Sequence, residues 1–211
     1  MVSVLLWTMP PIKIIKTLKS LQSKIIVAII SLLTISCSKN PCSLSSEKLA
    51  ALNWQDSVLS LPETREHIKA WDKASYDEPS LFEATNESYR YKLGSHDYSE
   101  IIRIEKRDNN YFVTKKVFNG MPGDPNTKPV IQNFQVSIQT WDSLTNSLKE
   151  MDFWTYCYID TTRYLDGYTC SIEAFNPIKN KCTSKNYHVI GGNCPKDSNF
   201  LKMCKLFKQL K

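Results

Sequence analysis

The sequence lacks the short motifs by which many enzymes are recognised. It contains no GxSxG, no HExxH, no P-loop and no Rossmann fingerprint, so the usual sequence signals for serine hydrolases, zinc proteases and nucleotide-binding enzymes are missing. It also has no CxxC pair, and the spacings of thirteen, twelve, twelve and ten residues between its last five cysteines match no zinc pattern. The motifs therefore predict neither a metal site nor a cofactor.

The apolar run Ile25–Ile35 is too short for a membrane span. It has eleven residues, about half of the roughly 20 that a spanning helix needs. Four lysines precede it with no acidic residue among them, and the small residue Ser36 and then Cys37 follow it. A basic segment, an apolar segment and a small residue, in this order, are typical of an export signal.

The end of this signal resembles that of bacterial lipoproteins, in which a peptidase cuts before a cysteine that carries lipid. The segment Thr34–Cys37 resembles a relaxed lipobox, with Thr34 where the family usually has leucine. The thiolate is a strong nucleophile, which suits Cys37 to alkylation by a lipid donor. The resemblance implies stable attachment to a membrane through several acyl chains. An ordinary cleaved signal with Cys37 as a bystander is the alternative. Ser38 is not the aspartate that retains some lipoproteins in the inner membrane, which favours the outer membrane.

Removal of residues 1–36 leaves little net charge. Four of the 27 basic residues lie in that segment, leaving 23 basic against 21 acidic residues, or about +2. Nucleic-acid-binding domains normally need a strongly basic face, so we expect no nucleic-acid partner. The remaining length suits a single domain.

The cysteines agree with export. Apart from Cys37, six remain as disulfide candidates, and five of these lie between residues 157 and 204: Cys42, Cys157, Cys170, Cys182, Cys194 and Cys204. Disulfides persist outside the cytoplasm, so up to three bridges are possible. The sequence does not choose among the fifteen pairings.

The hydrophobic pattern predicts an α+β domain. After a signal peptide over 1–36 and a lipidated tether over 37–46, residues 47–88 read as short helices, one ending near Leu52 and one from Pro62 to Trp71, followed by an irregular connector. From residue 89 to 211 the period is mostly two, with strands near 89, 102–105, 111–118, 134–138, 168–175 and 185–190. An amphipathic helix follows the fourth strand, and another follows Pro195. We expect an antiparallel sheet of five to six strands with both helices packed on one side.

Several short segments in this domain resemble a family of uncharacterised bacterial exported proteins and lipoproteins. They are Tyr89-Arg90-Tyr91, Ile102-Arg103-Ile104-Glu105, Trp141-Asp142, Phe153-Trp154, Leu165-Asp166-Gly167, Glu173 and Tyr187-His188-Val189. The family often has an aromatic residue where this chain has Cys170, and an Arg-Trp pair before the proline that is here Pro195. These departures imply a disulfide-bearing variant. The resemblance implies no activity.

Some of these polar residues could form an active site. Asp166, Glu173 and His188 are two acids and a histidine at or beside expected strands, which could in principle carry acid–base chemistry as an envelope hydrolase. We prefer a structural interpretation, in which Arg103 and Glu105 make cross-strand pairs and the histidine supports the fold.

Aromatic residues suggest binding instead. Trp154, Tyr156, Tyr158 and Tyr164 lie in or beside an expected loop over 155–167, and long loops with exposed aromatics often bind ligands. With Arg103 they are the binding candidates, although Trp141 and Trp154 are more readily explained as core residues. We therefore expect a membrane-anchored envelope module that binds a protein, peptide or glycan.

Overall fold

A computed structural model of the chain describes residues 44–157, 167–183 and 185–211. Leu44–Lys211 form one compact unit. Within the described ranges, no helix is both long enough and apolar enough to cross a bilayer. The expected signal peptide, Cys37 and Cys42 lie outside the described residues.

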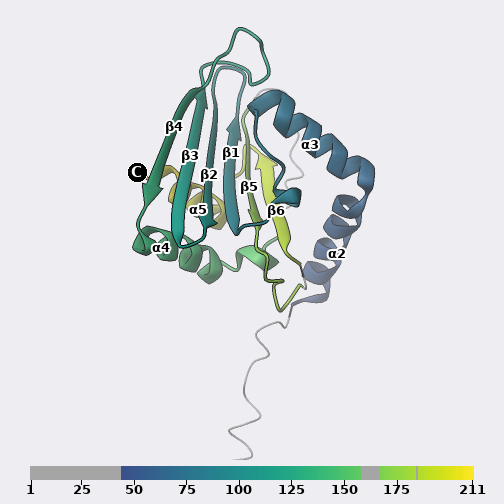
Figure 1. Ribbon diagram of the computed structural model, residues 1–211. Helices are drawn as coiled ribbons and strands as arrows, with labels where there is room; N and C mark the ends of the chain where they lie inside the picture. Colours follow the sequence, from purple (N-terminus) through teal and green to yellow (C-terminus); the bar gives the residue numbers. More distant parts are fainter. Residues whose placement is uncertain (1–43, 158–166, 184) are drawn as a thin grey trace, which may run out of the picture. The chain divides into compact units, whose positions relative to one another are not determined.

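The centre of the unit is a six-stranded sheet in which every neighbouring pair is antiparallel (Figure 1). The strand order is β4-β3-β2-β1-β5-β6. The strands are β1 (Ser88–Gly94), β2 (Ser99–Arg107), β3 (Asn110–Phe118), β4 (Val130–Val136), β5 (Thr169–Phe175) and β6 (Tyr187–Asn193). This confirms the α+β class and the strand number expected from the sequence.

Alternation along β1 and β2 divides the sheet into two chemically different faces. Tyr91 is paired with Ile102, and both side chains belong to the main hydrophobic core. The next pair along, Arg90 with Arg103, points to the opposite side, because successive side chains of a strand alternate between faces. We call the apolar side the inner face and the other side the outer face.

Two amphipathic helices cover the inner face. They are α4 (Ile138–Glu150) and α5 (Ser198–Lys208), and α5 lies behind the sheet in Figure 1. Trp141 of α4 stacks on Tyr111 with ring centroids 5.0 Å apart, and Phe200 and Phe207 of α5 are completely buried. Each of these helices starts with a side-chain cap, from Ser137 and Asp197 respectively. The placement of both helices on one face agrees with the sequence-based expectation.

The N-terminal helices are longer than the sequence suggested. Helix α2 (Ser46–Ser60) is capped by Ser45 and continues eight residues beyond Leu52, and α3 (Pro62–Tyr76) continues beyond Trp71. The expected connector over 72–88 also contains a 3-10 helix, η1 (Leu81–Glu83). The end of α3 packs on the outer face, since Asp72 and the residues just after Tyr76 make ion pairs and hydrogen bonds with the sheet. Tertiary contacts therefore extend helices that local pattern alone would end early.

Two further boundaries differ in detail. The Asp108–Asn109 turn joins β2 and β3, and Asp108 has a positive φ of 54°, as the hairpin interpretation required. Ile138, which we assigned to the fourth strand by alternation, is instead the first residue of α4. The cap from Ser137 explains the difference, because it stops the strand and starts the helix within one residue.

Candidate functional site

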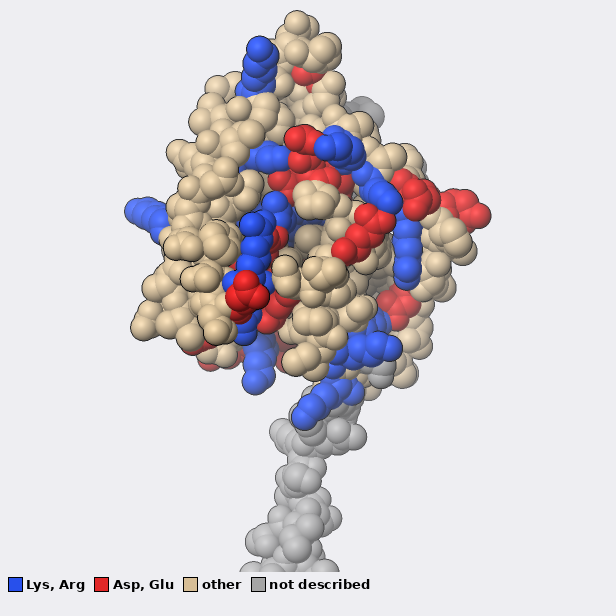
Figure 2. Space-filling model, viewed as in Figure 1, with Lys and Arg blue, Asp and Glu red and all other residues tan. Residues whose placement is uncertain are grey.

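Charged side chains gather on the outer face of the sheet, where Figure 2 shows basic and acidic groups side by side in the middle of the view. We call this cluster the ionic layer. It consists of Asp72, Glu78, Arg90, Lys92, Arg103, Glu105, Lys116 and Glu173. Its members come from α3, from the connector after α3 and from strands β1, β2, β3 and β5.

Arg90 is at the centre of the ionic layer. Its side chain is fully buried and donates to Asp72 and Glu173, each at 2.5 Å, and to the backbone oxygen of Pro79 at 2.7 Å. Lys92 reaches the other oxygen of each carboxylate, at 2.6 Å from Asp72 and 2.5 Å from Glu173. Burial alone would raise the pKa of Glu173, but the charges and hydrogen bonds of Arg90 and Lys92 outweigh it and hold that pKa at about 2.

The other half of the ionic layer secures the connector after α3. Glu78 is buried, and its two oxygens lie 2.9 Å from Arg103 Nε and 2.8 Å from Lys116 Nζ. Lys116 also donates to the backbone oxygens of Tyr76 and Asp77, and Arg103 pairs with Glu105. Arg103, a binding candidate from the sequence, is therefore already engaged by two carboxylates. These contacts make the ionic layer a means of fastening α3 to the sheet.

The residues considered for catalysis do not come together. Glu173 belongs to the outer face, whereas His188 of β6 is paired with Ala174 and faces the inner side. His188 is buried against Phe153, and its Nε2 lies 3.1 Å from the backbone oxygen of Tyr156. Burial lowers its pKa to about 4, so it is neutral at neutral pH. Asp166 lies outside the described residues. The sheet separates the acid from the histidine, so this geometry gives the hydrolase hypothesis no support.

The aromatic candidates are partly accounted for by packing. Trp154 is half-buried against the main core and lies next to Phe153 and His188. The hydroxyl of Tyr156 donates to Asp197, the residue that caps α5. Tyr158 and Tyr164 lie outside the described residues. The described part of the aromatic group therefore helps to join the 153–156 segment to α5.

Most of the described cysteines are thiols. Cys157, Cys170, Cys194 and Cys204 are free, and Cys182 is disulfide-bonded. Cys157 and Cys194 are half-buried, whereas Cys170 and Cys204 are buried and face one another across the interface between β5 and α5. Four of the five described cysteines are therefore in no bridge, so three bridges do not form among the six candidates, and Cys182 is the described cysteine that takes part in one.

The buried thiols line a pocket between α5 and one end of β1 and β5. Its volume is about 500 Å³, and we call it the α5 pocket. The lining consists of Tyr91, Leu93, Ser95, Tyr168, Cys170, Leu201, Cys204, Lys205 and Lys208. Lys205 and Lys208 are exposed, and the Lys208 ammonium lies 5.7 Å from the centre of the Tyr91 ring. The lining is mostly apolar and contains two lysines and no carboxylate among the described residues.

The pKa values of the two thiols and of Tyr91 in the α5 pocket are shifted from their ordinary values. The hydrogen bond that Cys170 shares with Cys204 lowers the pKa of Cys170, with a further contribution from Tyr91, although burial acts the other way. The same hydrogen bond and burial raise the pKa of Cys204. Burial, followed by the two sulfurs, raises the pKa of Tyr91. A mostly apolar pocket with a few convergent polar groups of perturbed pKa is the usual form of a small-molecule site.

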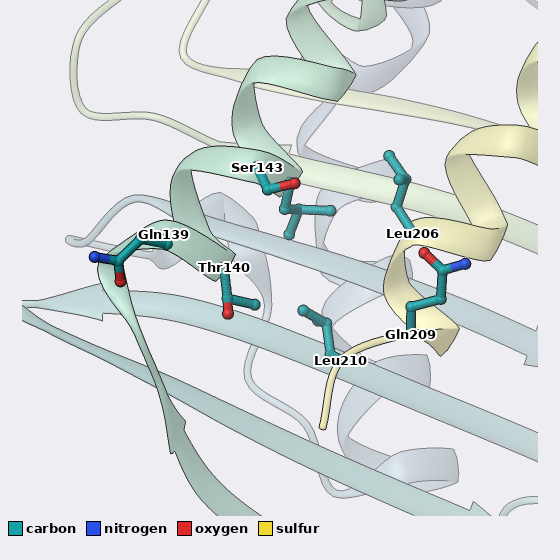
Figure 3. A pocket seen from close by; sticks show the side chains of 7 residues that line it. Gln139, Thr140, Ser143, Leu206, Gln209 and Leu210 are labelled. Atoms are coloured by element: carbon teal, nitrogen blue, oxygen red, sulfur yellow. The ribbon is translucent and has the colours of Figure 1, made fainter.

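Two other cavities are less suited to bind a charged ligand. A cavity of about 340 Å³ between α4 and α5 is shown in Figure 3, and it is lined by uncharged side chains, including Gln139, Thr140 and Gln209. A cavity of about 410 Å³ beside α3 contains Trp71, Asp72, Lys92 and Glu173. Its carboxylates are already paired with Arg90 and Lys92, so a ligand there would have to displace internal partners.

Comparison with protein-family models, with curated proteins and with solved structures found no match to this chain.

The fold brings together two groups of residues that the sequence pattern did not indicate as sites. Arg90 was noted only within Tyr89-Arg90-Tyr91, yet its position between two inner-facing aromatics indicates a charged residue on the opposite face of a strand. Lys205 and Lys208 follow the apolar stripe of the last helix at a spacing of three, which places both on one flank. Nothing in the sequence indicated that this flank adjoins an apolar hollow.

Proposed function

We propose that this protein is a lipid-anchored envelope protein whose α+β domain binds a small amphipathic anion in the α5 pocket. The single observation that carries the ligand class is the lining of that pocket: an apolar hollow of about 500 Å³ bordered by two exposed lysines and no described carboxylate. Pockets for small ligands commonly have volumes of about 300–1,000 Å³ and hold the apolar part of the ligand by burial.

The occupant that fits this lining is a carboxylate with an apolar tail, such as a medium-chain fatty acid. Leu93, Leu201 and Tyr168 provide apolar and aromatic surface, which favours the tail. Lys205 and Lys208 are point charges on flexible stems, which suits them to an anionic head group at the mouth. A cationic ligand would meet both lysines without a compensating acid in the described lining.

Binding can be tested with dodecanoate by isothermal titration calorimetry on the purified full chain. We expect binding by the wild type and a 5- to 30-fold weaker affinity in the double variant Lys205→Gln/Lys208→Gln, because each exposed ion pair contributes up to about 1 kcal/mol. The double variant Lys202→Gln/Lys211→Gln removes the same charge outside the pocket and should bind like the wild type.

Two further measurements separate the pocket from non-specific adsorption. Leu201→Glu places a carboxylate in the lining and should abolish dodecanoate binding while leaving the circular dichroism spectrum unchanged. Dodecanol, which lacks the charge, should bind the wild type and the Lys205/Lys208 variant equally. Absence of dodecanoate binding to the wild type, or equal losses in the two double-lysine variants, would contradict the proposal.

The anchor is a separate part of the proposal and has its own test. It is supported by the order of basic segment, apolar segment and Ser36-Cys37, which resembles a lipoprotein signal. In a bacterial host, labelled palmitate should be incorporated into the wild-type chain and a Cys42→Ser variant but not into Cys37→Ser. Label in the Cys37→Ser variant would refute Cys37 as the lipidated residue, and no label in the wild type would refute lipidation; neither result affects the ligand assay.

A further inference from the structure

The two buried thiols at the back of the α5 pocket lie close together. Cys170 of β5 and Cys204 of α5 are separated by 34 positions in the chain, but their sulfurs are 3.2 Å apart. Only 3% of Cys170 and 4% of Cys204 is exposed, so each thiol has the other as its near neighbour and meets solvent only through the pocket that both line. A disulfide requires its sulfurs about 2.05 Å apart, so a small side-chain adjustment would join them.

We infer that Cys170 and Cys204 form a redox-active pair that closes to a disulfide and fastens α5 to the sheet. The oxidant is a disulfide of a small thiol compound, such as oxidised glutathione. This inference does not depend on the identity of the ligand proposed above, although the α5 pocket provides the route by which the oxidant reaches the sulfurs.

The chemistry is a pair of thiol–disulfide exchanges. The Cys170 thiolate attacks one sulfur of the oxidant, whose S–S bond breaks and releases one small thiolate, leaving a mixed disulfide on Cys170. Cys204 then loses its proton, and its thiolate attacks Cys170 Sγ and displaces the second small thiolate. The two released thiolates take up the two protons of the cysteines. The protein thus loses two hydrogens, and the oxidant is reduced to two thiols.

The local contacts favour Cys170 as the first nucleophile. The two thiols share a hydrogen bond in which either sulfur can donate, and Lys208 favours the thiolate of both, but Cys170 also accepts a hydrogen bond from Tyr91. Each of these contacts stabilises the thiolate, which is the reactive form. Because the contact with Tyr91 belongs to Cys170, we assign Cys204 as the resolving thiol.

The cross-link would act on the site as well as on the fold. The chain between its ends contains β6 and the start of α5, so closure fixes the helix that carries Lys205 and Lys208. Cys157 and Cys194 are also thiols, but they are half-buried and do not line the α5 pocket. They provide the comparison sites within the same chain.

Peptide mapping of the full chain tests the inference. The reduced protein is incubated with oxidised glutathione without denaturant, remaining thiols are blocked with N-ethylmaleimide, and tryptic peptides are analysed without reduction. We expect a peptide pair joined through Cys170 and Cys204 in the wild type and in a Cys194→Ser control. Maleimide on both Cys170 and Cys204 of the wild type, or Cys170 joined to another cysteine, would overturn the inference; neither readout needs a substitution.

Two variants test the order of attack. In Cys204→Ser, Cys170 should stop at the mixed disulfide and carry one glutathione. In Cys170→Ser, Cys204 should carry none and should instead be blocked by maleimide after denaturation. Glutathione on Cys204 but not on Cys170 would reverse the roles and contradict the assignment of Cys170 as nucleophile.

Discussion

Replacing the buried Arg90 by methionine should destabilise the protein far more than replacing an exposed arginine of the sheet. The methionine side chain fits a buried position without a charge or a hydrogen-bond donor. It would leave Asp72 and Glu173, both nearly without solvent contact, with Lys92 as their remaining cation in this part of the ionic layer. It would also leave the backbone oxygen of Pro79 without the donor that Arg90 provides.

The size of the effect follows from the buried carboxylates. Removing one partner of a buried ion pair typically costs about 3–5 kcal/mol, because the other charge is left uncompensated. The lowering of the pKa of Glu173 from 4.5 to about 2 corresponds to about 3 kcal/mol of net stabilisation of its charged form, after the opposing effect of burial has been overcome by Arg90 and Lys92. Since Lys92 remains, we expect the free energy of unfolding to fall by about 3 kcal/mol.

Urea denaturation of the full chain, followed by tryptophan fluorescence and by circular dichroism, measures this loss. Arg107→Met is the matched control, since Arg107 is on the neighbouring strand and pairs with Glu105, but its side chain is 52% exposed. Exposed pairs contribute about 0–1 kcal/mol, so the control should lose less than that. Equal losses in the two variants, or a loss below about 1 kcal/mol in Arg90→Met, would refute the view that the ionic layer needs its central arginine.

Three further changes follow from the same structure. Glu173→Gln should destabilise the fold by about 3 kcal/mol near neutral pH. Because the folded-state pKa of Glu173 is depressed, the stabilisation by its charged form is complete above about pH 4.5 and is lost as the pH falls towards 2. The free energies of unfolding of variant and wild type, measured by urea titration, should therefore converge in acid. The pKa of His188 is about 4 in the fold and 6.5 as a free side chain, so on acidification the unfolded chain binds the proton first. The free energy of unfolding of the wild type should therefore fall by about 2.5 kcal/mol between pH 7 and 4.5, and His188→Phe should abolish this loss. Identical pH profiles of the two proteins would argue against a buried neutral imidazole. A Cβ at Gly191 would lie 2.8 Å from the Cys170 oxygen and 2.8 Å from Ser171 Cβ, so Gly191→Ala should force β5 and β6 apart at a cost of about 1–3 kcal/mol, and an unchanged melting temperature would contradict this.

The hydrophobic pattern of the sequence predicted the strands, the hairpin turn and the amphipathic helices, because each of these depends on residues close together in the chain. The two-residue period of β2 and β3, the turn at Asp108 and the helical spacing of Trp141, Leu144 and Leu148 all agree with the structure. These features could be read because alternation and amphipathicity record which side of an element is buried. The same logic gave the sheet class and the side on which α4 and α5 pack.

The candidate sites could not be read in this way, because their residues meet only in three dimensions. Arg90 is separated from Asp72 by 18 positions and from Glu173 by 83. Neither partner is marked by periodicity, since a buried charge on an outer face and a solvated one look alike in sequence. The grouping of Glu173 with His188 was misleading for the same reason. The two are on adjacent strands, but the register pairs His188 with Ala174 and so places it on the other face.

The sequence by itself determined the export-type N-terminal pattern as an expectation, the α+β class and the apolar stripes that make one core, because each of these is a property of consecutive residues. Only the tertiary structure decided that α3 closes over charged strands, that Cys170 meets Cys204 and that Lys205 and Lys208 border an apolar hollow. The physical reason is that strand register and helix docking are set by summed packing over the whole domain. The packing of the whole domain decides which distant side chains become neighbours, and no short stretch of sequence carries that information.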